Sequence, residues 1–186
     1  MLLTLDLATV LGWTKGHISD RQFESGYFRL PSTGQDIGRF AAAYDEWLSN
    51  MLMNVTETCF EAPVLPAKTQ LMTVRKLGGL CWHTEWLTTS MGIACFECHL
   101  QSVKKAIAGH GRAQKSDMIA AVRAYGYDVD EENEADAIAV RLYTIMTRHK
   151  ELAADFGLSL GLLGTAPQKR ASVAEQRVSQ LLGPED

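Results

Sequence analysis

The order of its apolar segments constrains the fold of this chain more than any other feature. Three short strand-like segments come first, and then helices and strands alternate until the pattern becomes entirely helical. We expect strands over 2–7, 12–16, 22–30, 56–61 and 92–98, and helices over 36–53, 67–90, 101–108, 113–125 and about 133–148. Such an order predicts an α/β fold, with a mixed sheet of about five strands and helices on both faces.

Several local features refine this prediction. The last strand, 92–98, is so apolar that we expect it to be buried on both faces. Thr33 or a nearby residue could cap the first helix, and Asn133 could cap the last. Gly78 and Gly79 lie inside the long helix, where they could introduce a kink.

Length and composition predict one folded domain. The chain has 186 residues, of which 46% are hydrophobic, and this suffices for a core. We place this domain at 1–150 and an extension, appended or partly disordered, at 151–186, where the pattern weakens. The four cysteines are typical of buried thiols, and we expect a cytoplasmic protein with no leader peptide and no membrane span. A net charge of −4 argues only weakly against nucleic acid, because a local basic face can bind phosphates.

Three acidic residues occupy unusual contexts. Asp6 interrupts the apolar first strand, Glu61 ends a strand just before a proline turn, and Asp136 begins an apolar helix. A buried carboxylate is costly unless it is paired, hydrogen-bonded or bound to a metal. The three residues could therefore form salt bridges, turn caps or favourable contacts with a helix dipole. They could also bind two Mg²⁺ or Mn²⁺ ions for phosphodiester hydrolysis.

Four segments in order resemble the RuvC-type Holliday-junction resolvases of the ribonuclease H-like superfamily. These are the aspartate strand with its glycine turn at 5–13, the second-carboxylate strand at 59–63, the basic segment at 103–115 and the last helix at 134–139. The resemblance spans residues 4 to about 145. It implies a ribonuclease H-like fold and a homodimer that cuts branched DNA with two Mg²⁺ or Mn²⁺ ions, in DNA recombination and repair.

The resemblance assigns Asp6, Glu61 and Asp136 as catalytic metal ligands, but the fourth ligand departs from the family pattern. The family commonly has an acidic residue three positions before the last aspartate, where this chain has Asn133. Glu134 is the expected substitute, and Glu132 lies one helical turn before Asp136. The tail after residue 148 has no clear family counterpart, which suggests a divergent member encoded by a bacteriophage.

The strongest concentration of positive charge lies in the 101–108 helix, at the start of the 113–125 helix and in the turn between them. Lys104, Lys105, Arg112 and Lys115 are interrupted only by glycines and neutral residues. They predict contacts to DNA phosphates, although a solvated helix face has the same composition. The family resemblance favours DNA binding.

The motif Cys95-x-x-Cys98-His99 matches the pattern of covalent haem attachment. We expect no haem, because such attachment normally requires export, and no zinc, because no second ligand pair follows at usable spacing.

Other functions stay open beside a junction resolvase. A less selective DNA nuclease on the same fold is the nearest alternative. A kinase of the actin-like superfamily also has an aspartate in its first strand, but 186 residues are too few for its two lobes. A catalytically weak DNA-binding scaffold would lack one carboxylate, and Asn133 is the one hint of that.

Overall fold

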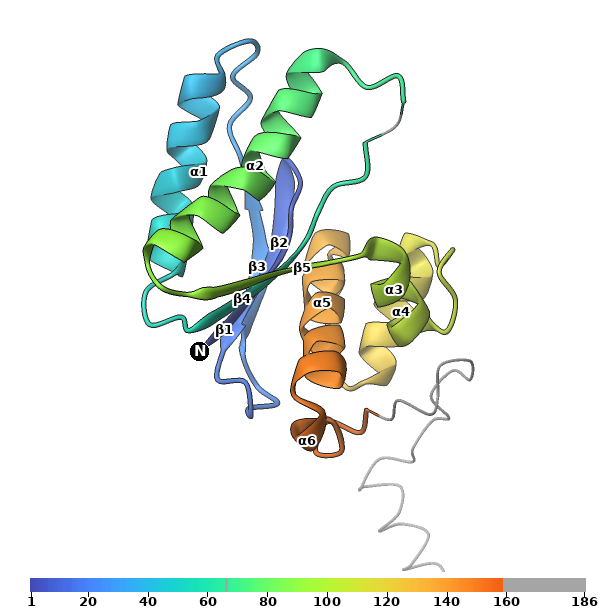
Figure 1. The fold of residues 1–186 in the computed structure, drawn as a ribbon. Helices are drawn as coiled ribbons and strands as arrows, with labels where there is room; N and C mark the ends of the chain where they lie inside the picture. The colour runs from blue at the N-terminus through green and yellow to red at the C-terminus, as the bar shows by residue number, and fades with distance from the viewer. Residues whose placement is uncertain (66, 159–186) are drawn as a thin grey trace, which may run out of the picture.

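A five-stranded mixed sheet forms the centre of the protein (Figure 1). The computed structural model describes residues 1–65 and 67–158. The strands lie in the order β3-β2-β1-β4-β5, with β1, β2 and β3 antiparallel and β4 and β5 parallel to β1. Their bounds are β1 Leu2–Asp6, β2 Val10–Gly16, β3 Glu24–Arg29, β4 Glu57–Glu61 and β5 Ala94–Cys98.

Helices cover both faces of this sheet, which confirms the predicted architecture. On one face lie α1 (Ile37–Met51) and α2 (Leu71–Ser90), which share one apolar core with the sheet. The other face carries a second core under four helices (Figure 1). They are α3 (Leu100–Ala108), α4 (Lys115–Ala124), α5 (Glu132–Arg148) and α6 (Lys150–Ala153).

The cap of α1 is a residue near Thr33, as expected, whereas the cap of α5 is not Asn133. The side chain of Asp36 accepts a hydrogen bond from the backbone N–H of Arg39 at 2.9 Å and caps α1, whereas Thr33 donates to the carbonyl of Asp36. At α5 the cap is Glu131, whose carboxylate accepts from the backbone N–H of Glu134 at 2.8 Å. A carboxylate at this position also interacts favourably with the helix dipole.

The prediction that the last strand is buried on both faces is wrong. β5 is an edge strand, and only Cys98 among its five residues is buried. The composition of β5 is as apolar as that of a central strand, but β5 lies at the edge of the sheet and pairs with only one other strand, β4. The long helix α2 runs without a break from Leu71 to Ser90, with Gly78 and Gly79 inside it.

The packed region continues past residue 150. Phe156 and Leu158 are buried in the core beneath α5, so the described end of the chain belongs to the domain rather than to an extension. The rest of the expected extension, from residue 159, lies outside the described residues. Across 1–65 and 67–158, none of the helices combines the length and apolar character that a membrane crossing requires.

Candidate metal centre

Asp6 and Glu61 lie side by side at the carboxyl ends of two parallel strands. Asp6 is the last residue of β1, Glu61 is the last residue of β4, and the register pairs them directly. Side chains in register on neighbouring parallel strands project from the same face of a sheet. A backbone hydrogen bond of 3.2 Å from Leu7 to the carbonyl of Glu61 joins the two strand ends. Sheet register therefore brings these two carboxylates together.

Asp136 comes to the same place on α5, which approaches the sheet very closely. A Cβ atom on Gly12 would lie 1.7 Å from the carbonyl oxygen of Asn133, so only glycine allows α5 to begin there. One turn further, the hydroxyl of Thr4 donates to the carbonyl of Ala137 at 3.0 Å and shares a 2.6 Å hydrogen bond with Thr14. These buried contacts hold the first turns of α5 against β1 and β2.

The three carboxylates also influence one another electrostatically. Burial, followed by the charge of Asp136, raises the pKa of Asp6 to about 7. Burial, followed by the charges of Asp6 and Asp136, raises the pKa of Glu61 to about 8. Burial raises the pKa of Asp136 to about 6, although Lys104 and Lys115 oppose this change. Negative charge is therefore in excess at this point of the fold.

This donor set fits a hard divalent cation in its chemistry. Carboxylate oxygens are the ligands that Mg²⁺ and Mn²⁺ prefer, and a bound cation would relieve the repulsion that raises these pKa values. Within the part of the chain that the structure describes, no three acidic, histidine or cysteine side chains are arranged so that they could hold one ion as they stand. The backbone thus gathers the carboxylates, and their side chains would have to turn inward around an ion.

Two of the four predicted DNA-binding residues lie at this centre. The ammonium group of Lys104 donates to the carbonyl of Ala113 at 2.8 Å and lowers the pKa of all three carboxyl groups. Lys115 forms an ion pair with Glu132, and its charge acts on Asp6 and Asp136. Both lysines thus lie where a phosphate beside the carboxylates would need positive charge.

The other two predicted DNA-binding residues, Lys105 and Arg112, are exposed. Neither forms an ion pair with any residue in the described ranges. Gly109 ends α3 with a φ of 84°, a left-handed conformation that glycine adopts without strain, and the chain then turns towards Arg112. Lys105 and Arg112 are therefore free to contact an external anion.

Glu134 does not join the three central carboxylates. Its carboxylate accepts a hydrogen bond of 2.7 Å from the hydroxyl of Ser25 on β3. Residues two apart on a helix point in nearly opposite directions, whereas residues four apart share a face. Because α5 begins regularly at Glu132, it is Glu132 and not Glu134 that shares a face with Asp136. The choice of Glu134 as the substitute ligand required an irregular start, and the structure does not show one.

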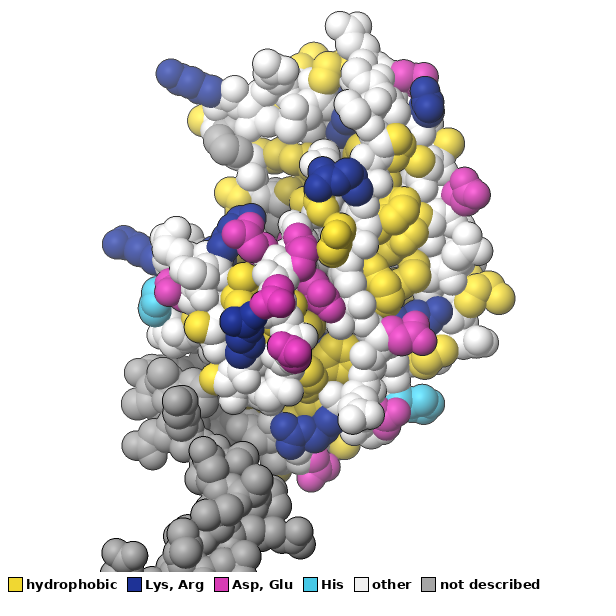
Figure 2. Space-filling view, turned by 180° about the vertical axis from the view of Figure 1, so that it is seen from behind, with side chains coloured by type: hydrophobic (Ala, Val, Ile, Leu, Met, Phe, Trp, Pro, Cys, Tyr) yellow, Lys and Arg dark blue, Asp and Glu magenta, His cyan; other side chains and the backbone are white. Residues whose placement is uncertain are grey.

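Two further glutamates surround the centre. The charge of Glu131 raises the pKa of Asp6 and of Asp136, and the charge of Glu132 raises that of Asp136. Glu131 also accepts a hydrogen bond of 2.6 Å from the side-chain amide of Asn133. Figure 2 shows acidic side chains gathered on one face of the molecule, with lysine and arginine side chains at the border of the group. Glu131 is not among the site residues that the sequence motifs predict, although a carboxylate just before a helix is a recognisable signal.

The Cys95-x-x-Cys98-His99 motif is divided by the sheet. Cys95 packs against the core under α2, and Cys98 is buried in the core under α5. Residues three apart on a strand point to opposite faces, so these two sulfur atoms cannot meet. The Nδ1 atom of His99 accepts a hydrogen bond of 3.3 Å from the backbone of Gln101 and caps α3.

Comparison with known proteins finds similarity in solved structures. No family model matches the chain, and no curated protein matches it either. The structure of Thermus thermophilus RuvC superposes with a TM-score of 0.59 and 17% identity, covering 84% of this chain and 96% of that one. T. thermophilus RuvC in complex with a Holliday-junction substrate gives a TM-score of 0.60 and 21% identity, covering 81% and 96%.

The fold therefore belongs to the ribonuclease H-like α/β class. Within that class, the strand order, the helices on both faces and the near-complete coverage of both solved structures make it a RuvC-like fold.

Proposed function

We propose that this protein is an endonuclease that hydrolyses phosphodiester bonds in Holliday junctions or other branched DNA with Mg²⁺ or Mn²⁺. One observation carries the proposal: Asp6, Glu61 and Asp136 converge from three separate elements into a centre with excess negative charge, in a RuvC-like fold. The junction-bound form of T. thermophilus RuvC supports the choice of substrate.

Asp6, Glu61 and Asp136 would hold the ions, and Glu132 is the best placed fourth carboxylate because it shares a face of α5 with Asp136. Two bound divalent ions would supply an activated water and stabilise the leaving oxygen. Lys104 and Lys115 would bind the phosphates on either side of the scissile bond, because their ammonium groups already act on these carboxylates. Glu132, which pairs with Lys115 in the free protein, would release it to the DNA.

The test is cleavage of a synthetic four-way junction and of a linear duplex of matched length, with Mg²⁺, Mn²⁺, Ca²⁺ or excess EDTA. We expect symmetric cuts in the junction with Mg²⁺ or Mn²⁺ and binding with little cutting in Ca²⁺, whose larger coordination shell misplaces the attacking water. Equal cleavage of both substrates would favour the less selective nuclease. Full activity in EDTA would contradict a metal-dependent mechanism.

A DNA-binding scaffold without strong activity is the second candidate. It is favoured by the absence, among the described residues, of a ready-made set of three metal ligands. Tight junction binding without cleavage in either metal would support the scaffold.

We further propose a homodimer. A four-way junction presents pairs of strands with equivalent geometry, so two identical centres related by a two-fold axis could cut it symmetrically.

A further inference from the structure

The edge strand β3 carries two side chains, Tyr27 and Arg29, on the same face of the sheet as the carboxylates. The register pairs Tyr27 with Gly12, and Gly12 with Asp6, so that these three residues form one row across β3, β2 and β1. Residues directly opposite each other in antiparallel strands lie on one face of the sheet. Arg29 follows Tyr27 by two residues and therefore projects from that face as well. Two strand spacings, or about 10 Å, separate Tyr27 from Asp6.

Both side chains of this β3 surface, Tyr27 and Arg29, are available to an external ligand. Tyr27 is 54% exposed, and Arg29 is exposed too. Neither side chain forms a hydrogen bond or an ion pair with any residue of 1–65 or 67–158. Arg29 pairs in register with Val10, which lies two residues beyond the row of Asp6. Its guanidinium group thus belongs to the end of the sheet at which the strands of the carboxylates end.

A line of negative charge at the start of α5 separates the β3 surface from the basic residues of α3 and α4. Glu132 pairs with Lys115 on α4, and two residues later Glu134 accepts its hydrogen bond from Ser25 on β3. Glu131 caps the same helix end. Figure 2 shows the acidic side chains gathered together, with lysine and arginine side chains around them. A phosphate backbone that passed from α4 to β3 would cross these carboxylates, and like charges repel.

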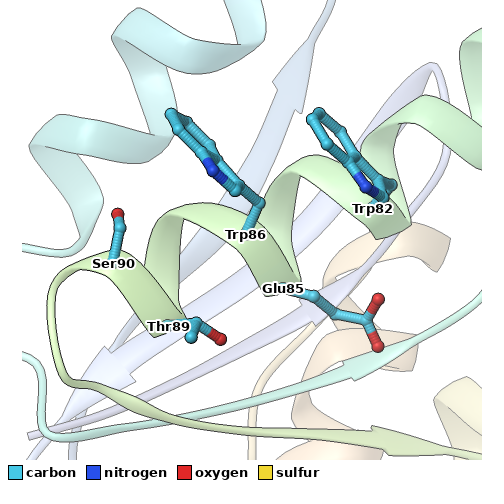
Figure 3. A pocket seen from close by; sticks show the side chains of 5 residues that line it. All are labelled: Trp82, Glu85, Trp86, Thr89 and Ser90. Carbon is cyan, nitrogen blue, oxygen red and sulfur yellow. The ribbon is translucent and has the colours of Figure 1, made fainter.

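The opposite side of the sheet offers no comparable surface for phosphates. A shallow hollow of about 400 Å³ lies there on α2, around Trp82, Glu85 and Trp86 (Figure 3). The one charged residue that lines this hollow is acidic. Phosphate oxygens accept hydrogen bonds from arginine and tyrosine side chains, and the β3 surface presents one of each on the carboxylate face.

We propose that Tyr27 and Arg29 bind phosphates of one arm of a branched DNA, while Lys105 and Arg112 bind phosphates of another arm. The guanidinium group of Arg29 can donate two parallel hydrogen bonds to one phosphate, and the hydroxyl group of Tyr27 can donate one. This inference rests on the proposed function, because it adds to the same centre the contacts that select a junction.

The acidic start of α5 gives this arrangement its preference for branched DNA. A straight duplex could reach both surfaces only by carrying its phosphates over Glu131, Glu132 and Glu134, which costs electrostatic free energy. Two arms that diverge at a branch point can lie on either side of these carboxylates. A linear duplex therefore uses the basic segment alone, and a junction uses the β3 surface in addition.

Fluorescence anisotropy in Ca²⁺, with a four-way junction and a linear duplex of matched length, tests this assignment on the full chain. Arg29→Gln should raise the junction Kd by about tenfold and flatten the dependence of log affinity on log salt by about one unit, for the junction alone. Tyr27→Phe, which removes only the hydroxyl group, should raise the junction Kd by about threefold. Neither variant should change the duplex Kd. Arg39→Gln removes an exposed arginine from α1, on the other face of the sheet, and is the matched control that should leave both Kd values unchanged.

Glu134→Gln tests the acidic barrier in the same assay. Loss of this charge should lower the duplex Kd by about threefold and narrow the preference for the junction. An unchanged duplex Kd in this variant would overturn the barrier. The assignment of the β3 surface would be overturned if Arg29→Gln weakened binding of both DNAs equally or of neither, or if the wild type bound both with equal affinity. Junction-selective binding without cleavage would leave the β3 surface standing and remove the proposed nuclease activity alone.

Discussion

The helix layer around α5 and the helix layer around α2 cover the same sheet with opposite chemistry. Beneath α5, the buried Glu61 and the partly buried Asp6 lie where strands β4 and β1 end, and nearby lysines only partly neutralise them. On α2 the unusual feature is outside, where Trp82 and Trp86 are exposed on a nearly uncharged face. One layer thus keeps costly polar groups inside and the other keeps apolar groups outside. Each is a departure from what stability alone would favour.

The largest effect should come from removing a charge in the acidic layer. Asp6→Asn, Glu61→Gln and Asp136→Asn should each lower junction cleavage by about 10²–10³-fold or more, because a lost ligand charge weakens metal binding. Single-turnover cleavage with Mn²⁺ measures this, and gel-shift binding in Ca²⁺ should stay near wild type. Glu85→Gln on α2 is the matched control. Normal cleavage by Asp136→Asn would contradict the assigned site.

Substitutions at two glycines, one in each layer, should have opposite effects on stability. Gly12→Ala should destabilise the protein by about 1–3 kcal/mol or more and displace Asp136, because the new methyl group meets the carbonyl of Asn133. Gly79→Ala inside α2 should be neutral or stabilise the protein by up to about 1 kcal/mol. Urea unfolding at pH 6 measures both. If Gly12→Ala were as stable and active as the wild type, α5 would not need its close approach to β2.

The stability of the protein should depend on pH because of the carboxylates beneath α5, Glu61 above all. Glu61 has its pKa raised to about 8, so the folded chain holds a proton that the unfolded chain releases from about pH 4.5 upward. Stability in EDTA should therefore fall as pH rises from about 4 to about 8. Glu61→Gln should flatten this decline and raise the Tm at pH 8.

Adding Mn²⁺ at pH 8 should raise the Tm of the wild type, because an ion that binds the folded state stabilises it. The same addition should raise the Tm of Glu61→Gln much less. A wild-type Tm that is insensitive to both pH and Mn²⁺ would show that these carboxylates lack the predicted coupling.

The smallest effect should come from the exposed basic residues beside the acidic layer. Lys105→Gln with Arg112→Gln should weaken binding to junction and duplex alike, and it should flatten the dependence of log affinity on log salt by about two units, one for each phosphate contact. Binding titrations at several salt concentrations measure this slope. Lys150→Glu, a charge reversal at an exposed position of α6, is the control and should leave the slope unchanged. An unchanged slope would mean that Lys105 and Arg112 do not contact phosphates and are simply exposed to solvent.

The sequence by itself determined the order of the elements and the main acidic positions. Periodicity of two and of 3.6 residues is local, so the strand ending at Asp6, the strand ending at Glu61 and the helix bearing Asp136 could all be predicted. Partial or full burial of these three carboxylates could be predicted for the same reason, because each adjoins an apolar segment.

Tertiary structure alone decided which of these residues meet. The edge position of β5 follows from strand order, which apolar content does not encode, so a strand expected to be buried is exposed. The direction of Glu134 depends on where the first turn of α5 begins, and Glu131 fixes that start by capping it. The close contact between Gly12 and Asn133 could not be predicted from the sequence, because these residues are far apart in the chain. Local patterns record the preferences of single segments, whereas a site at the junction of β1, β4 and α5 depends on register and close approach between them.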